Sequence, residues 1–410
     1  MRLSQRAQRV EPFYVMELAK AAAELDSRSK PGDRDMLYLN IGEPDFTAPP
    51  LVCEAAVRAL RDGRSQYTQA TGLPALREAI SGWYASRFGL SIDPARIVVT
   101  AGASAALQLA CLALIDTGDE VLMPDPSYPC NRQFVQVAGG RPVLIPCGPE
   151  QRFQLSAEQV EAAWKPNTRG VLLASPSNPT GTSIAPEELR RIAQVVNQRG
   201  GVTLVDEIYL GLSFDEAFGH SALGLLGTNG EPLGENIISV NSFSKYFNMT
   251  GWRLGWLVAP TALVPAIERL AQNLFICAST LAQHAALACF ETESLAEYER
   301  RRAEFKARRD YFIPALNRLG LSVPVMPDGA FYAWADVQAW CRQWNIVEGS
   351  ASQAEGGSWA FALELMKRCQ IAATPGRDFG QSEPWRYLRF STASSMAQLQ
   401  EAVARLEAAR

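Results

Sequence analysis

Residues 170–206, GVLLASPSNPTGTSIAPEELRRIAQVVNQRGGVTLVD, decide the fold class. Two apolar runs, GVLLAS and VTLVD, lie on either side of an amphipathic helical stretch, PEELRRIAQVVNQRG. Strands that are apolar along their whole length and are separated by helices indicate a mainly parallel sheet that is covered on both faces. This segment therefore predicts an α/β protein.

The same alternation continues in both directions. Toward the N-terminus, RIVVT precedes ASAALQLACLALI and EVLMP precedes SYPCNRQFVQVAG; toward the C-terminus, NIISVNS and RLGWLVAP complete the pattern. Beyond these runs the pattern changes to a long charged helix, EYERRRAEFKARRDYFIPAL, and shorter elements. A chain of 410 residues is long for one core, so we expect a large domain with a smaller companion.

Composition and charge weigh against several classes of function. The net charge of -4 gives no electrostatic case for binding nucleic acid or an anionic membrane. No apolar run approaches the roughly 18 residues of a membrane span, and the basic N-terminal stretch lacks the apolar core of a secretory signal. The eight cysteines form no C-x-x-C pair and favour a reduced, cytoplasmic protein. The two histidines, His220 and His284, weigh against a histidine-rich metal site and a Ser-His-Asp hydrolase, so we expect no metal.

Polar and small residues gather where the predicted strands end. In open α/β sheets, ligands bind beyond the carboxyl ends of the strands, so residues at these ends are expected to share one site. The positions are Gly102, Ala103 and Ser104 in TAGASAAL, Asn178 in SPSNPTG, Asp206 in VTLVDEIY, and Ser242, Ser244 and Lys245 in VNSFSKY.

Each of these strand ends has its own chemistry. Small residues at the strand-to-helix turn of TAGASAAL expose backbone N–H groups at the positive end of a helix, which suits a phosphate. Asn178, between two prolines, is either a turn residue or an amide fixed in a cleft. A buried, unpaired Asp206 costs several kcal/mol, so it needs a cationic partner unless it caps a helix. Glu207 and Tyr209 beside it favour a polar pocket.

The run VNSFSKYFNMTGWRLGW, residues 240–256, adds two serines, a lysine and an arginine. All four could address a phosphate, but a phosphate alone needs no lysine at one particular position. A lysine, a strand-end aspartate, a tyrosine, an amide and a phosphate cradle together match the needs of pyridoxal phosphate. This cofactor requires an amine, a carboxylate near its ring nitrogen, donors for its phenolate oxygen and a site for its phosphate dianion.

Motifs that cover nearly the whole chain stand in the order of a known family: LYLNIGEPDFTAPP, QYTQATGLPALREAI, SPSNPTG, VDEIY, SFSKYFNMTGWRLGW, PDGAFYAW and YLRFSTA. With them the chain resembles the class I/II aminotransferases, pyridoxal-phosphate enzymes of fold type I, and within these the group that contains the prokaryotic aspartate aminotransferases. The resemblance implies a large cofactor-binding domain over residues 50–310, a small α+β domain over 311–410, and an N-terminal arm over 1–49 that belongs partly to the small domain. It also implies that the small domain closes over bound substrate.

The resemblance assigns the centre of the site residue by residue. Lys245 matches the lysine that binds the cofactor covalently and later carries a proton from the substrate Cα. Asp206 matches the carboxylate that keeps the ring nitrogen protonated. Tyr209 and Asn178 match the donors to the phenolate oxygen. Tyr128, in DPSYP, matches the aromatic ring that stacks on the cofactor; its alternative is a turn tyrosine that packs into the core.

The resemblance also places the phosphate and a second subunit. The phosphate anchors correspond to Ser242, Ser244 and Arg253, joined by the backbone of Gly102, Ala103 and Ser104. Tyr67 matches a residue that reaches the phosphate from the neighbouring subunit, so the resemblance implies a homodimer with shared sites.

The substrate carboxylate is expected to meet Arg389, in LRFSTA, which matches an arginine that forms a bidentate pair with it. Gly42 matches the backbone that approaches this carboxylate, and Asn178 is expected beside it. Phe331 and Tyr332 either line the side-chain pocket or belong to the core.

Specificity rests on Ser104. Aspartate-specific relatives carry a lysine at this position, and a hydroxyl does not offset the desolvation of a second carboxylate as an ammonium does. We therefore expect a preference for neutral amino acids, aromatic or aliphatic, with Tyr14 and Val15 as further apolar walls of the pocket.

The implied activity is ping-pong transfer of an amino group between an L-amino acid and a 2-oxo acid such as 2-oxoglutarate. Aspartate aminotransferase is one alternative, because a cation of the neighbouring subunit could hold the second carboxylate. A C–S β-lyase or an aminocyclopropane-carboxylate-type synthase would share the same motif residues. A regulator that senses the cofactor would need a DNA-binding domain, and the residues before IGEPDF carry no helix-turn-helix pattern.

Overall fold

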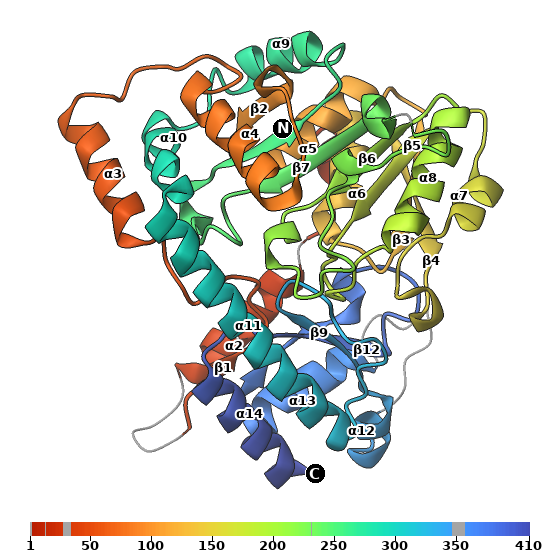
Figure 1. Ribbon diagram of the computed structural model, residues 1–410. Helices are drawn as coiled ribbons and strands as arrows, with labels where there is room; N and C mark the ends of the chain where they lie inside the picture. The colour runs from red at the N-terminus through yellow and green to blue at the C-terminus, as the bar shows by residue number, and fades with distance from the viewer. Residues whose placement is uncertain (1, 13, 28–33, 231, 347–356) are drawn as a thin grey trace.

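The computed structural model describes residues 2–12, 14–27, 34–230, 232–346 and 357–410, most of which form two lobes (Figure 1). The larger lobe surrounds a seven-stranded sheet, and the smaller lobe surrounds a three-stranded and a two-stranded sheet. The long helix α11 (Thr292–Arg318) runs from one lobe to the other. The domain boundaries at residues 50 and 311 stay a prediction.

The large sheet confirms the predicted α/β class. Its order is β2-β8-β7-β6-β5-β3-β4, and among the described strands only β8 runs antiparallel to its neighbours. Ala174 pairs with Asp206 and Asp206 with Val240, so β5, β6 and β7 end level with one another. The strands are β2 (Ile97–Thr100), β3 (Glu120–Asp125), β4 (Arg141–Pro146), β5 (Thr168–Ala174), β6 (Val202–Asp206), β7 (Ile237–Ser242) and β8 (Gly255–Val258).

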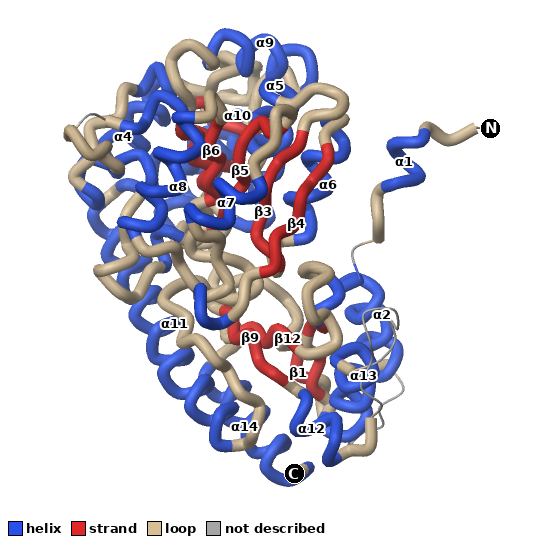
Figure 2. Tube along the Cα trace, turned by 90° about the vertical axis from the view of Figure 1, so that its right-hand side faces the viewer, coloured by secondary structure: helices blue, strands red, loops and turns tan. Residues whose placement is uncertain are grey.

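Helices cover both faces of this sheet because successive side chains of each strand point to opposite sides. Along β2, Val98 packs with one helical layer and Val99 with the other. Figure 2 shows the strands between the two layers. The first layer is α5 (Ala103–Leu114), α6 (Pro129–Ala138) and α9 (Val264–Leu274). The second is α4 (Pro74–Phe88), α7 (Ala157–Ala163), α8 (Pro186–Gln198) and α10 (Thr280–Leu287), with α3 (Pro50–Arg61) against α10.

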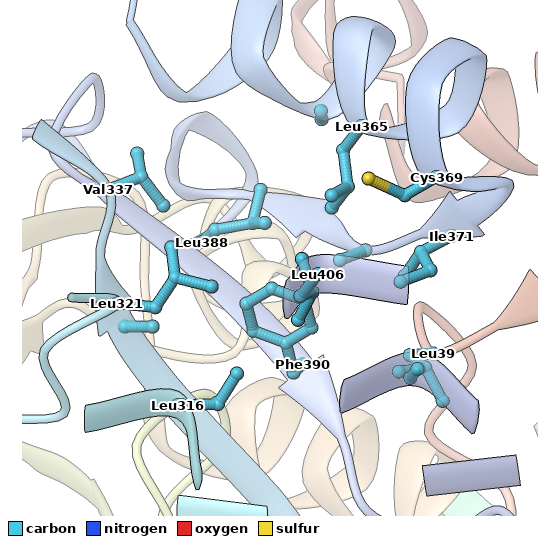
Figure 3. Close-up of a cluster of buried hydrophobic side chains, with 14 of the residues drawn as sticks. Leu39, Leu316, Leu321, Val337, Leu365, Cys369, Ile371, Leu388, Phe390 and Leu406 are labelled. Atoms are coloured by element: carbon cyan, nitrogen blue, oxygen red, sulfur yellow. The ribbon is translucent and has the colours of Figure 1, made fainter. Parts of the chain in front are cut away.

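The small lobe has its own apolar core, part of which is drawn in Figure 3. Helix α2 (Tyr14–Asp26) joins this core through Leu18 and Ala22, although it lies near the start of the chain. The other elements are β1 (Leu37–Tyr38), β9 (Tyr332–Asp336), β10 (Ile371–Ala372), β11 (Thr374–Pro375), β12 (Tyr387–Ser391), α12 (Gln338–Gln343), α13 (Ser358–Cys369) and α14 (Met396–Ala409).

The first helix, α1 (Gln5–Arg9), has no buried residue and lies outside the two lobes (Figure 2). Ser4 caps it by accepting the N–H of Ala7 at 3.1 Å. No helix in the described part of the chain is long and apolar enough to cross a bilayer.

Candidate active site

A cavity of about 580 Å³ lies where the carboxyl ends of the large-sheet strands face the small lobe. Most of the predicted site residues line it; Gly102, Tyr67 and the proposed wall residues Tyr14 and Phe331 do not. The structure thus brings segments from the whole chain to one place. The predicted residues that line the cavity are Gly42, Ala103, Ser104, Tyr128, Asn178, Asp206, Tyr209, Ser242, Ser244, Lys245, Arg253 and Arg389.

Lys245 lies in the turn after β7 and points its amine into the cavity. Its Nζ donates to the carbonyl of Gly42 at 2.6 Å. Burial lowers the pKa of Lys245 to about 8, against the opposing charge of Glu43. An amine with this pKa releases its proton near neutral pH, so Lys245 can act as a nucleophile or as a base.

Asp206 ends β6 and is 4% exposed. Its carboxylate accepts the N–H of Ile208 at 3.2 Å, and no ion pair holds it among the described residues. Burial raises the pKa of Asp206 to about 7, and the Ile208 N–H opposes that shift. A buried carboxylate without a cation fits a ligand that brings a protonated nitrogen to this point.

Helix α5 begins with an open N-terminus that faces Arg253. Its N-cap, Gly102, has φ 85° and forms no side-chain cap. A Cβ at this position would lie 2.7 Å from Arg253 Nη2, so glycine lets the guanidinium approach the first turn. Arg253 itself has φ 53°, a conformation that non-glycine residues seldom adopt. A cation beside a helix N-terminus makes an anion site.

The turn after β7 adds two hydroxyl groups to this anion site. The N–H of Ser244 donates to Ser242 Oγ at 3.0 Å, and Ser242 Oγ donates to the carbonyl of Leu254 at 3.3 Å. With the α5 N-terminus and the Arg253 guanidinium, these groups could hold a phosphate dianion.

Arg389 lies on β12 at the opposite side of the cavity and is 4% exposed. Its guanidinium donates to Asn178 Oδ1 at 2.8 Å and to the carbonyl of Asn40 at 2.7 Å. Its Nε is buried with no hydrogen-bond partner, and no carboxylate pairs with the guanidinium among the described residues. A buried guanidinium without a counter-ion is suited to the carboxylate of a ligand.

Two tyrosines connect the lobes inside the cavity. The hydroxyls of Tyr209 and Tyr332 are 2.7 Å apart, and their rings meet edge to face. Tyr332 therefore belongs to the cavity wall. Phe331 does not line the cavity; it is 1% exposed and packs behind it against Tyr209 and Phe305.

Helix α2 supplies the apolar end of the cavity. Val15 lines it as expected, together with Met16 and Ala19. Tyr14 does not line it: its ring stacks on the Arg377 guanidinium at 3.6 Å, and its N–H donates to Asp378 at 2.9 Å. Sequence reasoning missed Met16 and Ala19, although both lie on the helical face that contains Val15.

Other wall residues were also missed: Asn40, Ile41, Glu43, Leu107, Ala174, Pro176, Ile208, Thr250 and Gly251. Glu43 Oε1 accepts a hydrogen bond from the Thr250 hydroxyl at the edge of the cavity. Tyr67, by contrast, is 79% exposed and lies away from the cavity of its own chain.

Comparison with known proteins places this geometry in a family. The sequence model of "Aminotransferase class I and II" matches residues 34–406. The valine–pyruvate aminotransferase of Mycobacterium tuberculosis is 38% identical over 397 residues, which cover 97% of this chain and 96% of that protein. The aspartate aminotransferase of Geobacillus stearothermophilus is 32% identical over 406 residues, 99% of this chain and 98% of that protein.

Solved structures agree. A crystal structure of an aminotransferase from Mycobacterium tuberculosis has a TM-score of 0.88 and 38% identity, and the match covers 100% of this chain and 98% of that one. Aspartate aminotransferase from Thermus thermophilus with maleate has a TM-score of 0.85 and 31% identity, with 99% of each chain covered. The chain belongs to the class I and II aminotransferases, the pyridoxal-phosphate enzymes of fold type I.

Proposed function

We propose that this aminotransferase moves the amino group of a neutral L-amino acid, aromatic or aliphatic, to a 2-oxo acid such as 2-oxoglutarate by a ping-pong mechanism. The observation that carries the proposal is the charge of the cavity. Among its described wall residues the cations are Lys245, Arg253 and Arg389, and each has a role other than holding a second carboxylate. The wall that α2 provides is apolar, and Ser104 offers only a hydroxyl.

Pyridoxal phosphate fits this site. The cradle that a Cβ at residue 102 would fill would hold the phosphate, and Asp206, which forms no ion pair among the described residues, would face the ring nitrogen. Tyr128 would cover the ring, and Tyr209 and Asn178 would donate hydrogen bonds to its phenolate oxygen. When bound, this cofactor accepts the amino group and stabilises the negative charge that develops at the substrate Cα.

The chain's own residues perform the remaining tasks. Arg389 binds the α-carboxylate and, with the backbone of Gly42, orients the substrate so that its Cα–H points at Lys245. Lys245 Nζ takes that proton and later returns it, which its lowered pKa permits near neutral pH. The walls from both lobes exclude water around the reacting carbon.

A homodimer completes the proposal. The large lobe exposes apolar side chains next to a second cavity of about 620 Å³, which shares Glu43, Thr250 and Gly251 with the site. Val57 and Leu60 in its wall are 46% and 61% exposed. In the proposed dimer a second copy covers this face, and its exposed Tyr67 reaches the phosphate of the neighbouring site. Mixing Lys245→Ala and Tyr67→Ala chains should restore activity through hybrid dimers, and no recovery would contradict shared sites.

Substrate choice is tested by single turnovers of the cofactor-loaded protein with one amino acid at a time, followed by the cofactor's absorbance. We expect valine, methionine and phenylalanine to react faster than aspartate, and Ser104→Lys to raise the rate with aspartate specifically. Pyruvate and 2-oxoglutarate are then compared as acceptors, because one relative is a valine–pyruvate enzyme. Aspartate reacting far faster than the neutral amino acids would contradict the proposal, and release of ammonia without transfer would indicate a lyase.

A further inference from the structure

A second buried carboxylate, that of Glu207, directly follows Asp206 in the chain. Glu207 is 1% exposed. It does not line the active-site cavity. Its backbone N–H donates to the carbonyl of Val240 at 2.8 Å, which extends the pairing of β6 with β7 by one residue. The roles assigned above leave this side chain without a function.

Three neutral donors hold the Glu207 carboxylate. They are the hydroxyl of Ser239 on β7 at 2.6 Å, the hydroxyl of Ser221 at 2.9 Å, and the backbone N–H of Ala222 at 2.6 Å in the 3₁₀ helix η4 (Ala222–Gly224). No ion pair involves Glu207 among the described residues. The carboxylate is thus stabilised as an anion without any cation to cancel its charge.

The charged and titratable groups around Glu207 are few. Asp206 precedes it on β6, and the hydroxyl of Tyr84 on α4 forms a hydrogen bond with Ser239, one of the three donors. Burial raises the pKa of Glu207 to about 6, and its three donors limit that rise, so Glu207 carries its charge at neutral pH. The charge of Glu207 also adds to the effect of burial in raising the pKa of Asp206.

A buried anion without a cation is costly, and a well-packed neutral side chain would cost less. The charge is useful only if a positive group comes near it. The proposed function supplies that group, since Asp206 would face the protonated ring nitrogen of the bound cofactor. A second negative charge behind Asp206 makes loss of that proton less favourable.

We propose that Glu207 is a positioning residue for the cofactor: its carboxylate holds a second negative charge behind Asp206 and so strengthens the hold of Asp206 on the protonated ring nitrogen. It acts through Asp206 and touches neither cofactor nor substrate. The inference rests on the proposed function.

The test compares Glu207→Gln with wild type as holoenzymes that carry ring-¹⁵N-labelled pyridoxal phosphate. The ring nitrogen should lose its proton at a pH lower by about one unit, as read from its ¹⁵N chemical shift. The single-turnover rate with a neutral amino acid should fall about tenfold at unchanged KM. Glu120→Gln is the control, because Glu120 is also buried but lies at the amino end of β3, away from the cavity.

An unchanged ¹⁵N titration in Glu207→Gln, with only a lower melting temperature, would overturn the inference and leave Glu207 a structural role. If Glu207→Gln does not fold, Ser239→Ala replaces it in the test. This variant removes one of the hydrogen-bond donors to Glu207 and keeps the Glu207 carboxylate. Glu207 should then accept a proton at higher pH, so the turnover rate should fall more steeply than in wild type between pH 8 and 6. If the turnover rates of Ser239→Ala and wild type change in the same way with pH, the inference is overturned. Wild type that binds the cofactor but transfers no amino group would instead contradict the proposed function.

Discussion

The two ends of the cavity are built in different ways. At the sheet end, level strand termini carry buried polar groups, of which Asp206 is 4% exposed. At the α2 end, a helix from the small lobe presents apolar side chains, and Met16 is 65% exposed. The sheet holds charged groups at buried positions, where their electrostatic interactions are strong. The helix sets only the shape and polarity of the entrance. Changes at the sheet end should therefore remove the chemistry, and changes at the α2 end should alter substrate choice.

Lys245→Ala should have the largest effect and abolish transfer, because no other described amine lines the cavity. Borohydride treatment of wild type should fix the cofactor to a peptide that contains SFSKYF, as mass spectrometry would show. Lys306→Ala is the control, since Lys306 forms an exposed pair with Asp310 on α11. Multiple turnovers by Lys245→Ala would contradict the assignment.

Asp206→Ala should lower the turnover rate by about a thousandfold or more, a loss of roughly 4 kcal/mol of transition-state stabilisation. The variant lacks the counter-charge for the ring nitrogen. Asp206→Glu should retain more activity than Asp206→Ala, because it keeps the charge and changes only its position. Near-normal turnover of the alanine variant would mean that another acidic residue provides the counter-charge for the ring nitrogen.

Arg389→Lys should act on binding more than on the rate of the chemical step. A lysine keeps the charge but cannot form the paired hydrogen bonds of a guanidinium, so KM for every amino acid should rise by about tenfold or more. The control is Arg386→Lys, which changes the neighbouring ion pair with Asp336 outside the cavity. A KM that stays at the wild-type value would show that Arg389 does not bind the substrate carboxylate.

Asp378→Ala, which removes the hydrogen-bond acceptor, tests the α2 end. Asp378 is 1% exposed and accepts the N–H of Tyr14, so it fixes the first turn of α2 over the cavity. Loosening that turn should raise KM for bulky apolar amino acids about threefold, with little effect on alanine or on turnover. Equal changes for small and large substrates would show that α2 does not contribute to specificity.

The buried charges of the sheet end should also be visible in the stability of the cofactor-free protein. Burial raises the pKa of Asp206 to about 7, so the folded state binds more protons than the unfolded state between about pH 4 and 7. Stability should fall as pH rises through this window, and Asp206→Asn should flatten the slope. Lys245 has a lowered pKa of about 8, so it contributes a rise in stability above that pH. A melting temperature that rises from pH 4 to 7 with the same slope in both proteins would contradict this account.

The two ends also differed in how far the sequence could predict them. The sheet end could be read because parallel strands place their carboxyl termini at one edge, so Asp206 and Lys245 had to lie near each other. The anion site could be predicted from the small residues around Gly102. Small residues are needed there because another group approaches the backbone closely.

The α2 end depends on how two lobes meet, and local sequence does not encode that. Tyr14 was expected in the wall, but its ring is held by Arg377, a residue 363 positions away in the chain. Which of Phe331 and Tyr332 faces the cavity is decided by tertiary packing, since Phe331 packs against Tyr209 and Phe305. The contribution of Tyr67 depends on a second chain, which leaves it a prediction.

The central claim is transfer of an amino group from a neutral amino acid, and following the nitrogen tests it most directly. Wild-type holoenzyme would be mixed with ¹⁵N-valine or ¹⁵N-phenylalanine and a 2-oxo acid, with ¹⁵N-aspartate in a parallel reaction. The account predicts that the label appears in the amino acid formed from the oxo acid, and sooner from the neutral donors than from aspartate. Label that appears as free ammonia, or transfer that is far faster from aspartate, would contradict it.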